Sequence, residues 1–326
     1  MGESGLEKLK GQVEGEMGDS YDWTPVDEGL NTIYKLESKD EQYILKVHTN
    51  EENEIGWFRA EPKIYELVAN NTYVPSPEII YKDFSEEDYE NSFYVMEKLT
   101  GENPDKIKHD LSNEQLGNLM YKYGEILGKI HNIPTSFENY GLLSAEDGEL
   151  QTTDDAEKWT WSLQGTIDAW ADIVEDKWEE PVEIETPEAE IRERIPEEPE
   201  LVLNHSDNRL DNLLVEGDEV TGFIDWSHPR IGHNEYDLAR AEYLLIDWDL
   251  HFKDDETKES LRENLYEGYR QNNSIDEGFD ERREVYRFAT TAWLAAGFAN
   301  WGSQFDEETH AEMREGIIER LEEESL

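Results

Sequence analysis

Three polar side chains near the middle of the chain have the types and the spacing that phosphoryl transfer requires. The segment Leu201 to Trp226 contains the pattern His-x-Asp-x-x-x-x-Asn, with Asp207 and Asn212 as its acid and amide, and Asp225 follows a second apolar run. Phosphoryl transfer needs a group that orients or deprotonates the accepting hydroxyl, oxygen ligands for magnesium, and a cation for the phosphates. We interpret Asp207 as the first of these. Asn212 and Asp225 would be the neutral and the anionic magnesium ligands, because magnesium prefers oxygen donors.

A lysine far ahead of this segment could supply the cation. Lys46 stands inside the apolar run Tyr43 to Val47, where a lone charge is costly unless it is paired. Glu61, in the helix expected next, is the natural partner, as in the lysine and glutamate pair that positions nucleotide phosphates in kinases. The alternative is a lysine on an edge strand that points to water. The position of Lys46 before a helix favours the pair.

Neighbouring polar residues have less specific interpretations. His205 is expected to brace the loop by hydrogen bonding, and Asp237 to cap or brace the same segment. Arg209, two residues after Asp207, stands where protein kinases often carry a lysine that contacts the transferred phosphate. Its alternative role is a surface salt bridge to one of the many carboxylates.

Other residues favour structural roles over chemical ones. His228 and His233 flank Arg230, and a role in the structure of the loop is favoured over metal binding. A set of tryptophans could form a cage for a cationic substrate through cation–π contacts, although helix packing is the favoured interpretation. This set comprises Trp159, Trp161, Trp170 and Trp178.

The elements that must position these residues begin with a strand-rich part. Tyr34 to Val47 is expected to be a hairpin around the turn Ser38 to Asp40. Glu52 to Ala69 has apolar residues at mostly helical spacing, and Ile79 to Tyr81 and Ser92 to Met96 are expected to be strands. Up to about residue 99 the sequence therefore predicts a small lobe of strands with one main helix.

After Gly101 the pattern changes to long amphipathic helices. Further short elements are a hairpin of Leu213 to Val215 with Thr221 to Ile224, and an exposed connector at Pro181 to Pro199, which is rich in Glu and Pro. The expected helices are Asn113 to His131, Ala156 to Trp178, Glu235 to Ile246, Lys258 to Gln271, Glu281 to Trp301 and Glu308 to Leu321. The fold class predicted is α+β, with a larger, mostly helical second lobe.

The charge of the chain is extremely negative, with 29 Lys and Arg against 80 Asp and Glu and a net charge of −51. The 36 aromatic residues, 10 Trp, 16 Tyr and 10 Phe, are spread along the chain, which favours a folded protein with an acidic surface over disorder. Such a surface repels nucleic acid and anionic membranes. The chain has no Cys, starts without an apolar signal region and has no apolar stretch long enough to span a bilayer, so a cytoplasmic location is expected.

We expect the melting temperature to rise with salt concentration, because the sequence is typical of a salt-rich cytoplasm and a halophilic source. Repulsion among carboxylates destabilises the compact state in dilute buffer, and molar salt shortens the Debye length to about 3 Å. Thermal melts in a series from low to molar KCl check this expectation. Equal stability at both ends of the series would contradict it.

Several motifs occur together in an order that is typical of one superfamily. They are Gly29 to Tyr34, Lys46, Phe58 to Glu61, Met96 to Gly101, Leu127 to His131, His205 to Asn212, Ile224 to Trp226 and Tyr236 to Ala239. The chain thereby resembles the aminoglycoside phosphotransferase and choline kinase-like superfamily, relatives of the protein kinases. The resemblance covers about residues 25 to 245 and implies a protein-kinase-like two-lobe fold. Residues 1–99 would form the nucleotide-binding lobe, and residues 100–326 the catalytic and substrate-binding lobe.

The resemblance also implies ATP and Mg²⁺ as cofactors. Met96, Glu97 and Leu99 would lie in the linker that holds the adenine ring by backbone hydrogen bonds. Asn31 would belong to the first nucleotide-binding loop, and the helices after residue 245 would help to shape the acceptor pocket. This chain departs from the family pattern at Ser206, where Gly is common. It also departs at Asp211 and at Gly232-His233-Asn234.

The expected function is an ATP-dependent, magnesium-dependent phosphotransferase that acts on a hydroxyl of a small molecule, such as an aminoglycoside-like or choline-like acceptor. The alternative is a catalytically weak or inactive pseudokinase that regulates by binding nucleotide. A protein kinase is disfavoured, because Asp237 follows Asp225 by only 12 residues, too few for an activation loop. The acceptor and the oligomeric state stay open.

Overall fold

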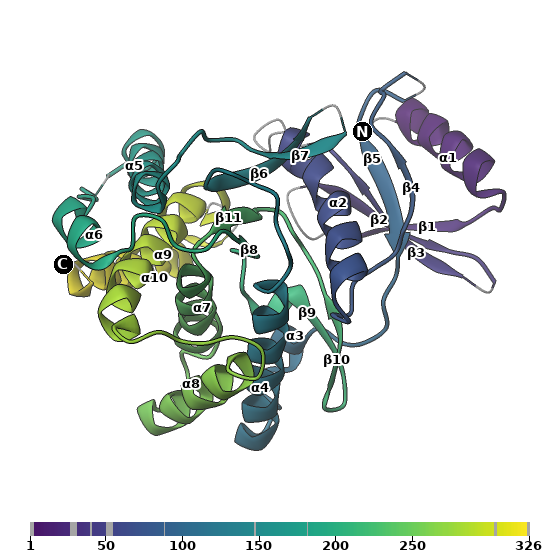
Figure 1. The fold of residues 1–326 in the computed structure, drawn as a ribbon. Coiled ribbons are helices and arrows are strands. Elements are labelled where there is room, and N and C mark those ends of the chain that lie inside the picture. The colour runs from purple at the N-terminus through teal and green to yellow at the C-terminus, as the bar shows by residue number, and fades with distance from the viewer. Residues whose placement is uncertain are drawn as a thin grey trace. The chain divides into compact units, whose positions relative to one another are not determined.

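The computed structural model describes residues 3–26, 31–39, 41–49, 55–87, 89–146, 148–180, 182–302 and 305–324 (Figure 1). The chain divides into two compact units. The first comprises Met1–Gln115, Leu143–Gln151 and Leu210–Pro229, and the second comprises Leu116–Leu142, Thr152–Arg209 and Arg230–Leu326. The chain therefore passes repeatedly from one unit to the other. The predicted boundary at residues 99 and 100 separates nucleotide binding from catalysis and substrate binding, and it stays a prediction.

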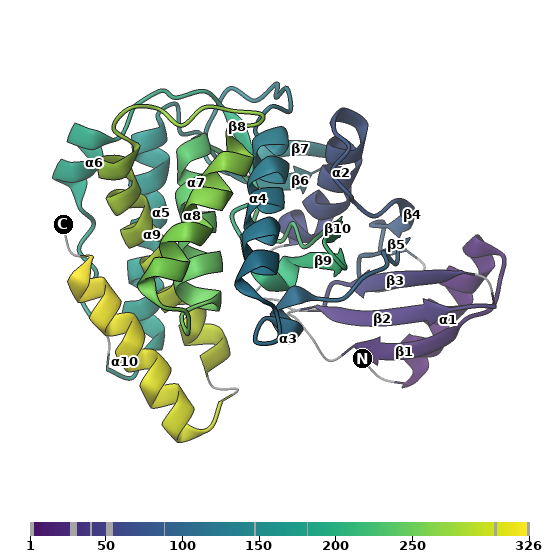
Figure 2. The ribbon, with the colours of Figure 1, turned by 90° about the horizontal axis from the view of Figure 1, so that it is seen from below.

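A five-stranded antiparallel sheet, with strand order β1-β2-β3-β5-β4, forms the centre of the first unit (Figure 2). Its strands are β1 (Asp22–Val26), β2 (Thr32–Glu37), β3 (Gln42–Val47), β4 (Ile79–Asp83) and β5 (Phe93–Glu97). The predicted hairpin is present as β2 and β3, with Ile33 opposite Lys46. Asp40 in its turn lies outside the described residues. Strand β1 was not predicted.

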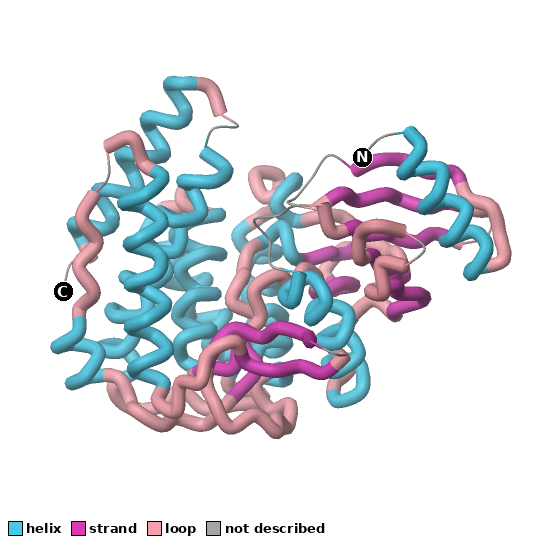
Figure 3. Tube along the Cα trace, turned by 90° about the horizontal axis from the view of Figure 1, so that it is seen from above, coloured by secondary structure: helices cyan, strands magenta, loops and turns pink. Residues whose placement is uncertain are grey.

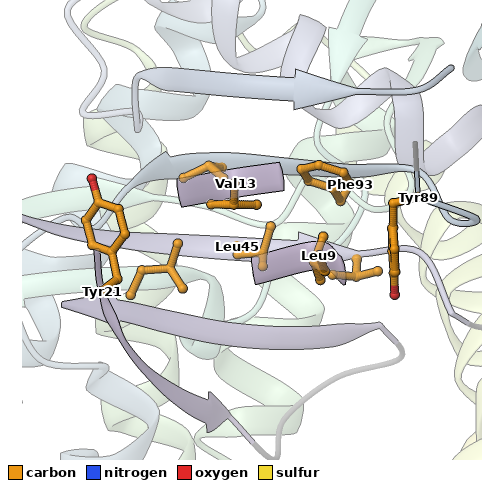
Figure 4. Close-up of a cluster of buried hydrophobic side chains, with 9 residues drawn as sticks. Leu9, Val13, Tyr21, Leu45, Tyr89 and Phe93 are labelled. Atoms are coloured by element: carbon orange, nitrogen blue, oxygen red, sulfur yellow. The ribbon is translucent and has the colours of Figure 1, made fainter. Parts of the chain in front are cut away.

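Two helices of the first unit accompany this sheet. Helix α2 (Ile55–Asn71) corresponds to the predicted Glu52 to Ala69, of which residues 52–54 lie outside the described residues. Helix α1 (Glu3–Met17) was not predicted, because few of its residues are apolar. Leu9 and Val13, about one turn apart, are nevertheless fully buried in a cluster with Leu45 and Phe93 of the sheet (Figure 4).

A short helical turn and a hairpin place both candidate metal ligands, Asn212 and Asp225, in the first unit. The 3-10 helix η1 (Leu210–Asn212) leads into β9 (Leu213–Glu216), which pairs with β10 (Glu219–Phe223), as predicted from the sequence. The Ile224 N–H donates to the Asn212 carbonyl over 3.0 Å. This bond closes the base of the hairpin between Asn212 and Asp225. The short helix α3 (Pro104–Ile107) belongs to the same unit.

Three further short strands support the second unit, and none of them was predicted. Strand β11 (Arg230–Gly232) pairs antiparallel with β8 (Val202–Asn204) and with the first two residues of β6 (Gly141–Glu146). The rest of β6 and most of β7 (Glu149–Thr152) belong to the first unit. The catalytic loop candidate therefore follows a strand, β8, that is held in a sheet.

Helices make up most of the second unit (Figure 3). Helices α4 (Asn113–Ile130) and α8 (Asp255–Tyr269) approach closely at two glycines. A Cβ atom on Gly124 would lie 2.0 Å from the Leu265 carbonyl oxygen, and one on Gly268 would lie 1.9 Å from the Tyr121 carbonyl oxygen. Where the structure describes the chain, no helix is long and apolar enough to cross a membrane. The helices are α4 (Asn113–Ile130), α5 (Trp159–Lys177), α6 (Glu188–Arg194), α7 (Asn234–Glu242), α8 (Asp255–Tyr269), α9 (Phe279–Trp301) and α10 (Glu307–Glu323).

Two predictions for segments of this unit are wrong. The segment Pro181 to Pro199 is not only an exposed connector, because it contains α6, whose Ile191 is buried, and it ends near the buried Ile195. The helix predicted to run to Ile246 changes at Tyr243 into a π-helix, η2 (Tyr243–Asp249). The apolar spacing of this region does not distinguish a π-helix from the α-helix before it.

Candidate active site

Lys46 forms the predicted ion pair with Glu61 inside the first unit. The Lys46 Nζ donates to Glu61 Oε1 over 2.8 Å, and both residues are buried. Lys46 lies on β3, which is bordered by β2 and β5. The alternative of a solvent-facing lysine on an edge strand is therefore wrong.

Two tyrosines that the sequence analysis did not single out hold the glutamate in place. Tyr65 OH donates to Glu61 Oε1 over 3.1 Å, and Tyr94 OH donates to Glu61 Oε2. Burial, and then the negative charge of Glu61, raise the pKa of both phenols well above the ordinary value, so both stay protonated donors. Two features could have indicated these tyrosines. Tyr65 is four residues after Glu61 on α2, and Tyr94 is opposite Lys46 in the pairing of β3 with β5.

Asp225 joins the same group of residues. Its Oδ1 lies 3.4 Å from Lys46 Nζ, and its N–H donates to Tyr65 OH over 2.9 Å. Burial alone would lower the pKa of Lys46, but Asp225 and then Glu61 raise it well above the ordinary value. Lys46 is therefore a fixed cation. Asp225 has a φ of 65°, a left-handed conformation that Asp tolerates better than most residues and that is often found at functional sites.

The donor chemistry at Asn212 and Asp225 fits magnesium. One is a neutral amide and the other a carboxylate, and Mg²⁺ is commonly bound by one or two carboxylates together with substrate phosphates. The side chain of Asp225 is 38% exposed, so its carboxylate is accessible from solvent. The described part of the chain contains no group of three or more His, Cys, Asp or Glu side chains that could hold a metal by themselves. A magnesium ion held by Asn212 and Asp225 would complete its coordination with water or with substrate phosphates.

Asp207 lies in the second unit, where Arg209 holds it by two hydrogen bonds. Arg209 Nε donates to Asp207 Oδ1 over 2.8 Å, and Nη2 donates to Oδ2 over 3.0 Å. The Asp207 side chain is 5% exposed and that of Arg209 is 35% exposed. Arg209 thus forms a salt bridge, which was its alternative role in the sequence analysis. Its partner is the candidate base Asp207. The boundary between the units falls directly after Arg209.

Asp237 braces the loop around Asp207, as predicted. Its carboxylate accepts hydrogen bonds from the N–H groups of His205 and Ser206 at 2.8 and 2.9 Å and from Asn208 Nδ2 at 2.6 Å. His131 Nε2 lies 3.2 Å from the same carboxylate. Burial would raise the pKa of Asp237, but the bond to His131 and the nearby charges lower it overall, so the acceptor stays ionised.

The bracing role of His205 is therefore carried, in part, by its backbone. Asn208 and His131 lie in motifs that carry the family resemblance but were given no role of their own, and Arg240 was missed, because it follows those motifs in a stretch that indicates an ordinary helix. Arg240 is buried, donates from Nε to the Ser206 carbonyl, and lies 4.1 Å from the ring centroid of Trp293. Together these contacts fix the backbone on both sides of Asp207.

Ser206 has a φ of 68°, in the left-handed region where the related family commonly has Gly. We expect Ser206→Gly to stabilise the protein by about 1 kcal/mol, because a left-handed non-glycine residue costs about 1–2 kcal/mol, partly offset by the added chain entropy of Gly. The Ser206 Oγ is also buried without a hydrogen-bond partner in the described part of the chain. Urea unfolding in molar KCl measures the difference.

The matched variant for this test is Ser206→Ala. It removes the same hydroxyl but keeps a Cβ in the left-handed conformation, so its gain should be smaller than that of Ser206→Gly. Equal free energies of unfolding for the two variants would show that the backbone conformation contributes nothing.

His233 has a structural role, as favoured from the sequence. Its Nδ1 lies 2.7 Å from Tyr286 OH. Burial, and then the charges of Arg282 and His131, lower the pKa of His233 to about 3. Neighbouring Arg230 is also buried, and it donates to Thr166 Oγ1 over 2.9 Å.

Acidification should destabilise the protein through His233. The folded state keeps this ring neutral, whereas the unfolded state binds a proton below the ordinary pKa of 6.5, so stability is present above pH 6.5 and falls as the pH drops from there toward 3. We expect His233→Asn to reduce this slope by up to about 1.4 kcal/mol per pH unit. Urea unfolding between pH 7 and 4.5 measures it, with the exposed His251→Asn as the control. Parallel slopes for the two variants would contradict the role of His233.

The tryptophan set is not gathered into one cage. Trp159 and Trp178 are buried by packing, as favoured from the sequence, while Trp161 is 55% exposed. The cations that meet these rings belong to the chain itself: Arg230 lies 5.5 Å from Trp159, and Arg240 lies 5.9 Å from Trp170.

The expected nucleotide-binding residues of the linker lie at the end of β5. The N–H of Glu97 donates to the Glu78 carbonyl over 2.8 Å, and that of Lys98 donates to Gln42 over 3.2 Å. Met96 is buried, and Leu99 follows the strand. Adenine binding by this segment stays a prediction.

Asn31 is the one residue of the predicted first loop that is described, since residues 27–30 lie outside the described residues. Its Oδ1 is buried and has no hydrogen-bond partner among the described residues. Its nucleotide-binding role also stays a prediction.

The antiparallel sheet with its lysine and helix glutamate, the mostly helical second unit and the braced aspartate loop define a protein-kinase-like phosphotransferase fold. A family model described as "Phosphotransferase enzyme family" matches residues 22–285, and the chain belongs to this family. It is accordingly an enzyme, a phosphotransferase whose acceptor is an alcohol group.

Solved structures with the same fold are distant in sequence. Aminoglycoside phosphotransferase APH(4)-Ia is 14% identical over 97% of this chain and 99% of its own, with a TM-score of 0.64. The ADP-bound form of APH(2'')-Ib is 15% identical over 99% of each chain, with a TM-score of 0.63. The ternary complex of APH(2'')-IIa with streptomycin and ATP is 15% identical over 96% of this chain and 95% of its own, with a TM-score of 0.61. At these identities the likeness shows the fold alone. No curated protein matched the chain.

Proposed function

We propose that the protein is an ATP-dependent and magnesium-dependent kinase that phosphorylates a hydroxyl of a small molecule. The observation that carries this proposal is the bonded group of Lys46, Glu61, Tyr65 and Asp225 in the first unit. It places a permanent cation beside a partly exposed carboxylate. Binding of a nucleoside triphosphate with its magnesium ion requires a cation for the phosphates and an anionic ligand for the metal.

The residues of the first unit would bind the nucleotide. Lys46 would contact the phosphates, and Glu61 with its two tyrosines would keep the ammonium group in position. Asn212 and Asp225 would hold magnesium, which when bound neutralises charge on the phosphates. Asn31, Met96, Glu97 and Leu99 would contact the nucleotide, as the resemblance to the family implies.

Asp207 would act on the acceptor. As the acceptor oxygen forms its bond to the γ-phosphorus and the bond from that phosphorus to the leaving oxygen of ADP breaks, Asp207 would take the hydroxyl proton. A carboxylate accepts about four hydrogen bonds, so the two from Arg209 orient Asp207 without using its whole capacity. Arg209 would be the residue that orients the carboxylate, and its exposed part could contact an oxygen of the transferred group.

The acceptor class is open within this proposal. Known structures of this fold carry hygromycin B with ADP, or streptomycin with ATP, which supports testing amino sugars first. Three buried carboxylates of α7 and η2 are, however, already paired with arginines: Glu235 with Arg282, Glu242 with Arg262, and Asp247 with Arg287. These carboxylates therefore give no support for a polycationic acceptor.

A transfer assay in molar KCl tests the proposal. The protein is incubated with radiolabelled [γ-³²P]ATP, MgCl₂ and one acceptor at a time from amino sugars, choline, ethanolamine, homoserine and neutral sugars. Labelled product should form with at least one class and disappear when EDTA is added. Nucleotide binding without transfer to any acceptor would support the pseudokinase alternative instead.

A further inference from the structure

We propose that the first unit carries a binding site for a small oxyanion, separate from the group around Lys46. A cavity of about 280 Å³ is lined by Arg59, Lys63, Phe84, Ala145 and Gly148. In a chain with 29 Lys and Arg against 80 Asp and Glu, two cationic side chains that line one small cavity are unusual. Phosphate or the carboxylate group of a small metabolite matches this chemistry.

The cavity lies beside one face of α2. Gly56, Arg59 and Lys63 are three and then four residues apart, so they share this face. A Cβ atom on Gly56 would lie 3.0 Å from the Ser144 Cβ, which shows how closely β6 packs against the helix at this point. Farther along the helix, Arg59 and Lys63 line the cavity together with Ala145 and Gly148.

Arg59 is held in a fixed orientation but retains a donor group. Its Nη2 donates to the Phe84 carbonyl at 3.1 Å, to Glu86 Oε1 at 2.9 Å and to Ser92 Oγ at 2.9 Å, and its Nε donates to the same Oγ. Nη1 takes part in none of these bonds. The guanidinium is thus rigid, and it also lies 5.7 Å from the Phe84 ring centroid.

Lys63 supplies the second cation. Glu86 pairs with Arg59, whereas no carboxylate among the described residues lies within ion-pair distance of Lys63. The two charged residues that line the cavity, Arg59 and Lys63, are thus both cations. An oxyanion would accept hydrogen bonds from Lys63 Nζ and Arg59 Nη1, and Phe84 and Ala145 would contact any apolar part of the ligand.

Such a ligand would act on the helix that carries Glu61. Glu61 is two residues after Arg59, which places it about 200° farther round the helix, on the side that faces Lys46. An anion bound between α2 and the lining residues Ala145 and Gly148 would fix the helix from its other side. The site does not depend on the proposed kinase function.

Isothermal titration with potassium phosphate, in KCl adjusted to constant ionic strength, tests the site. Wild type is compared with Lys63→Gln, Lys82→Gln and Lys46→Gln. Lys82 is the matched control, because it lies on β4 in the same unit and pairs with Glu66. We expect saturable binding in wild type, at least tenfold weaker binding in Lys63→Gln, and a change below twofold in Lys82→Gln and Lys46→Gln.

The outcomes separate this site from other sources of binding. Loss of binding in Lys46→Gln but not in Lys63→Gln would place the phosphate at the nucleotide site and overturn the proposal. Equal weakening of phosphate binding in the Lys63 and Lys82 variants would show a general effect of charge and would also overturn the proposal. Titration with potassium acetate distinguishes a carboxylate site from a phosphate site, and no saturable binding of either anion would refute the proposal.

Discussion

Replacing Asp207 by Asn is expected to lower kcat by about 10²- to 10⁴-fold, the range that a general base contributes, with nucleotide binding retained. The amide keeps the shape of the carboxylate but cannot take up the proton of the acceptor hydroxyl. The loop itself should persist, because its backbone is held by Asp237 and Arg240. Steady-state kinetics with the best acceptor of the transfer assay, together with ADP titration, measures the two effects.

The control for this variant is Asp218→Asn, the same chemical change at the exposed turn between β9 and β10. It should leave kcat within about twofold of wild type. A second variant, Arg209→Gln, separates the base from the residue that orients it. If the proposal holds, it lowers kcat less than Asp207→Asn, because the carboxylate remains but loses the two hydrogen bonds that orient it. Unchanged turnover in Asp207→Asn would refute the assignment.

The pair of Lys46 and Glu61 could be predicted because one local rule is strong. A single charge such as Lys46 in an apolar strand needs a partner of opposite charge, and the following helix contains Glu61. The tyrosines around that pair could not be predicted in the same way. A tyrosine on an amphipathic helix or a buried strand usually indicates packing, and only the final geometry turns Tyr65 and Tyr94 into hydrogen-bond donors for Glu61.

The contact between Lys46 and Asp225 joins residues that are 179 positions apart. No local pattern reports such a contact. The residue types gave both a role in phosphoryl transfer, and the order of motifs in the related family supported that shared role. Ser206 is the opposite case. Its departure from the expected Gly was visible in the sequence, and the left-handed backbone found there gives that departure a physical meaning.

Two helices that sequence patterns missed have few apolar residues. Helix α1 buries mainly Leu9 and Val13, and α6 buries Ile191, in segments that are otherwise mostly polar, charged or small. Acidic residues are abundant in this chain, with 80 Asp and Glu among 326 residues. A high content of Glu therefore does not distinguish a loop from a helix with a narrow buried face.

Asp225→Asn is expected to abolish most of the magnesium-dependent turnover, by about 10³-fold. A metal ion contributes several kcal/mol to phosphoryl transfer, and each 1.36 kcal/mol corresponds to tenfold in rate. Asn is the informative substitution, because it tolerates the left-handed backbone at this position as Asp does. The change therefore removes the charge while leaving the conformation. Rates measured against MgCl₂ concentration at saturating ATP should show both a lower maximum and a higher magnesium requirement.

Lys46 provides the internal check on this result. In Asp225→Asn the ammonium loses one of its two carboxylate partners but keeps Glu61 at 2.8 Å, so it should still bind nucleotide phosphates. ADP affinity without magnesium should thus be unchanged or higher, because the competing carboxylate is neutral, whereas the gain in affinity on adding magnesium should disappear. A variant that retains the full magnesium dependence would show that Asp225 pairs with Lys46 without holding the metal.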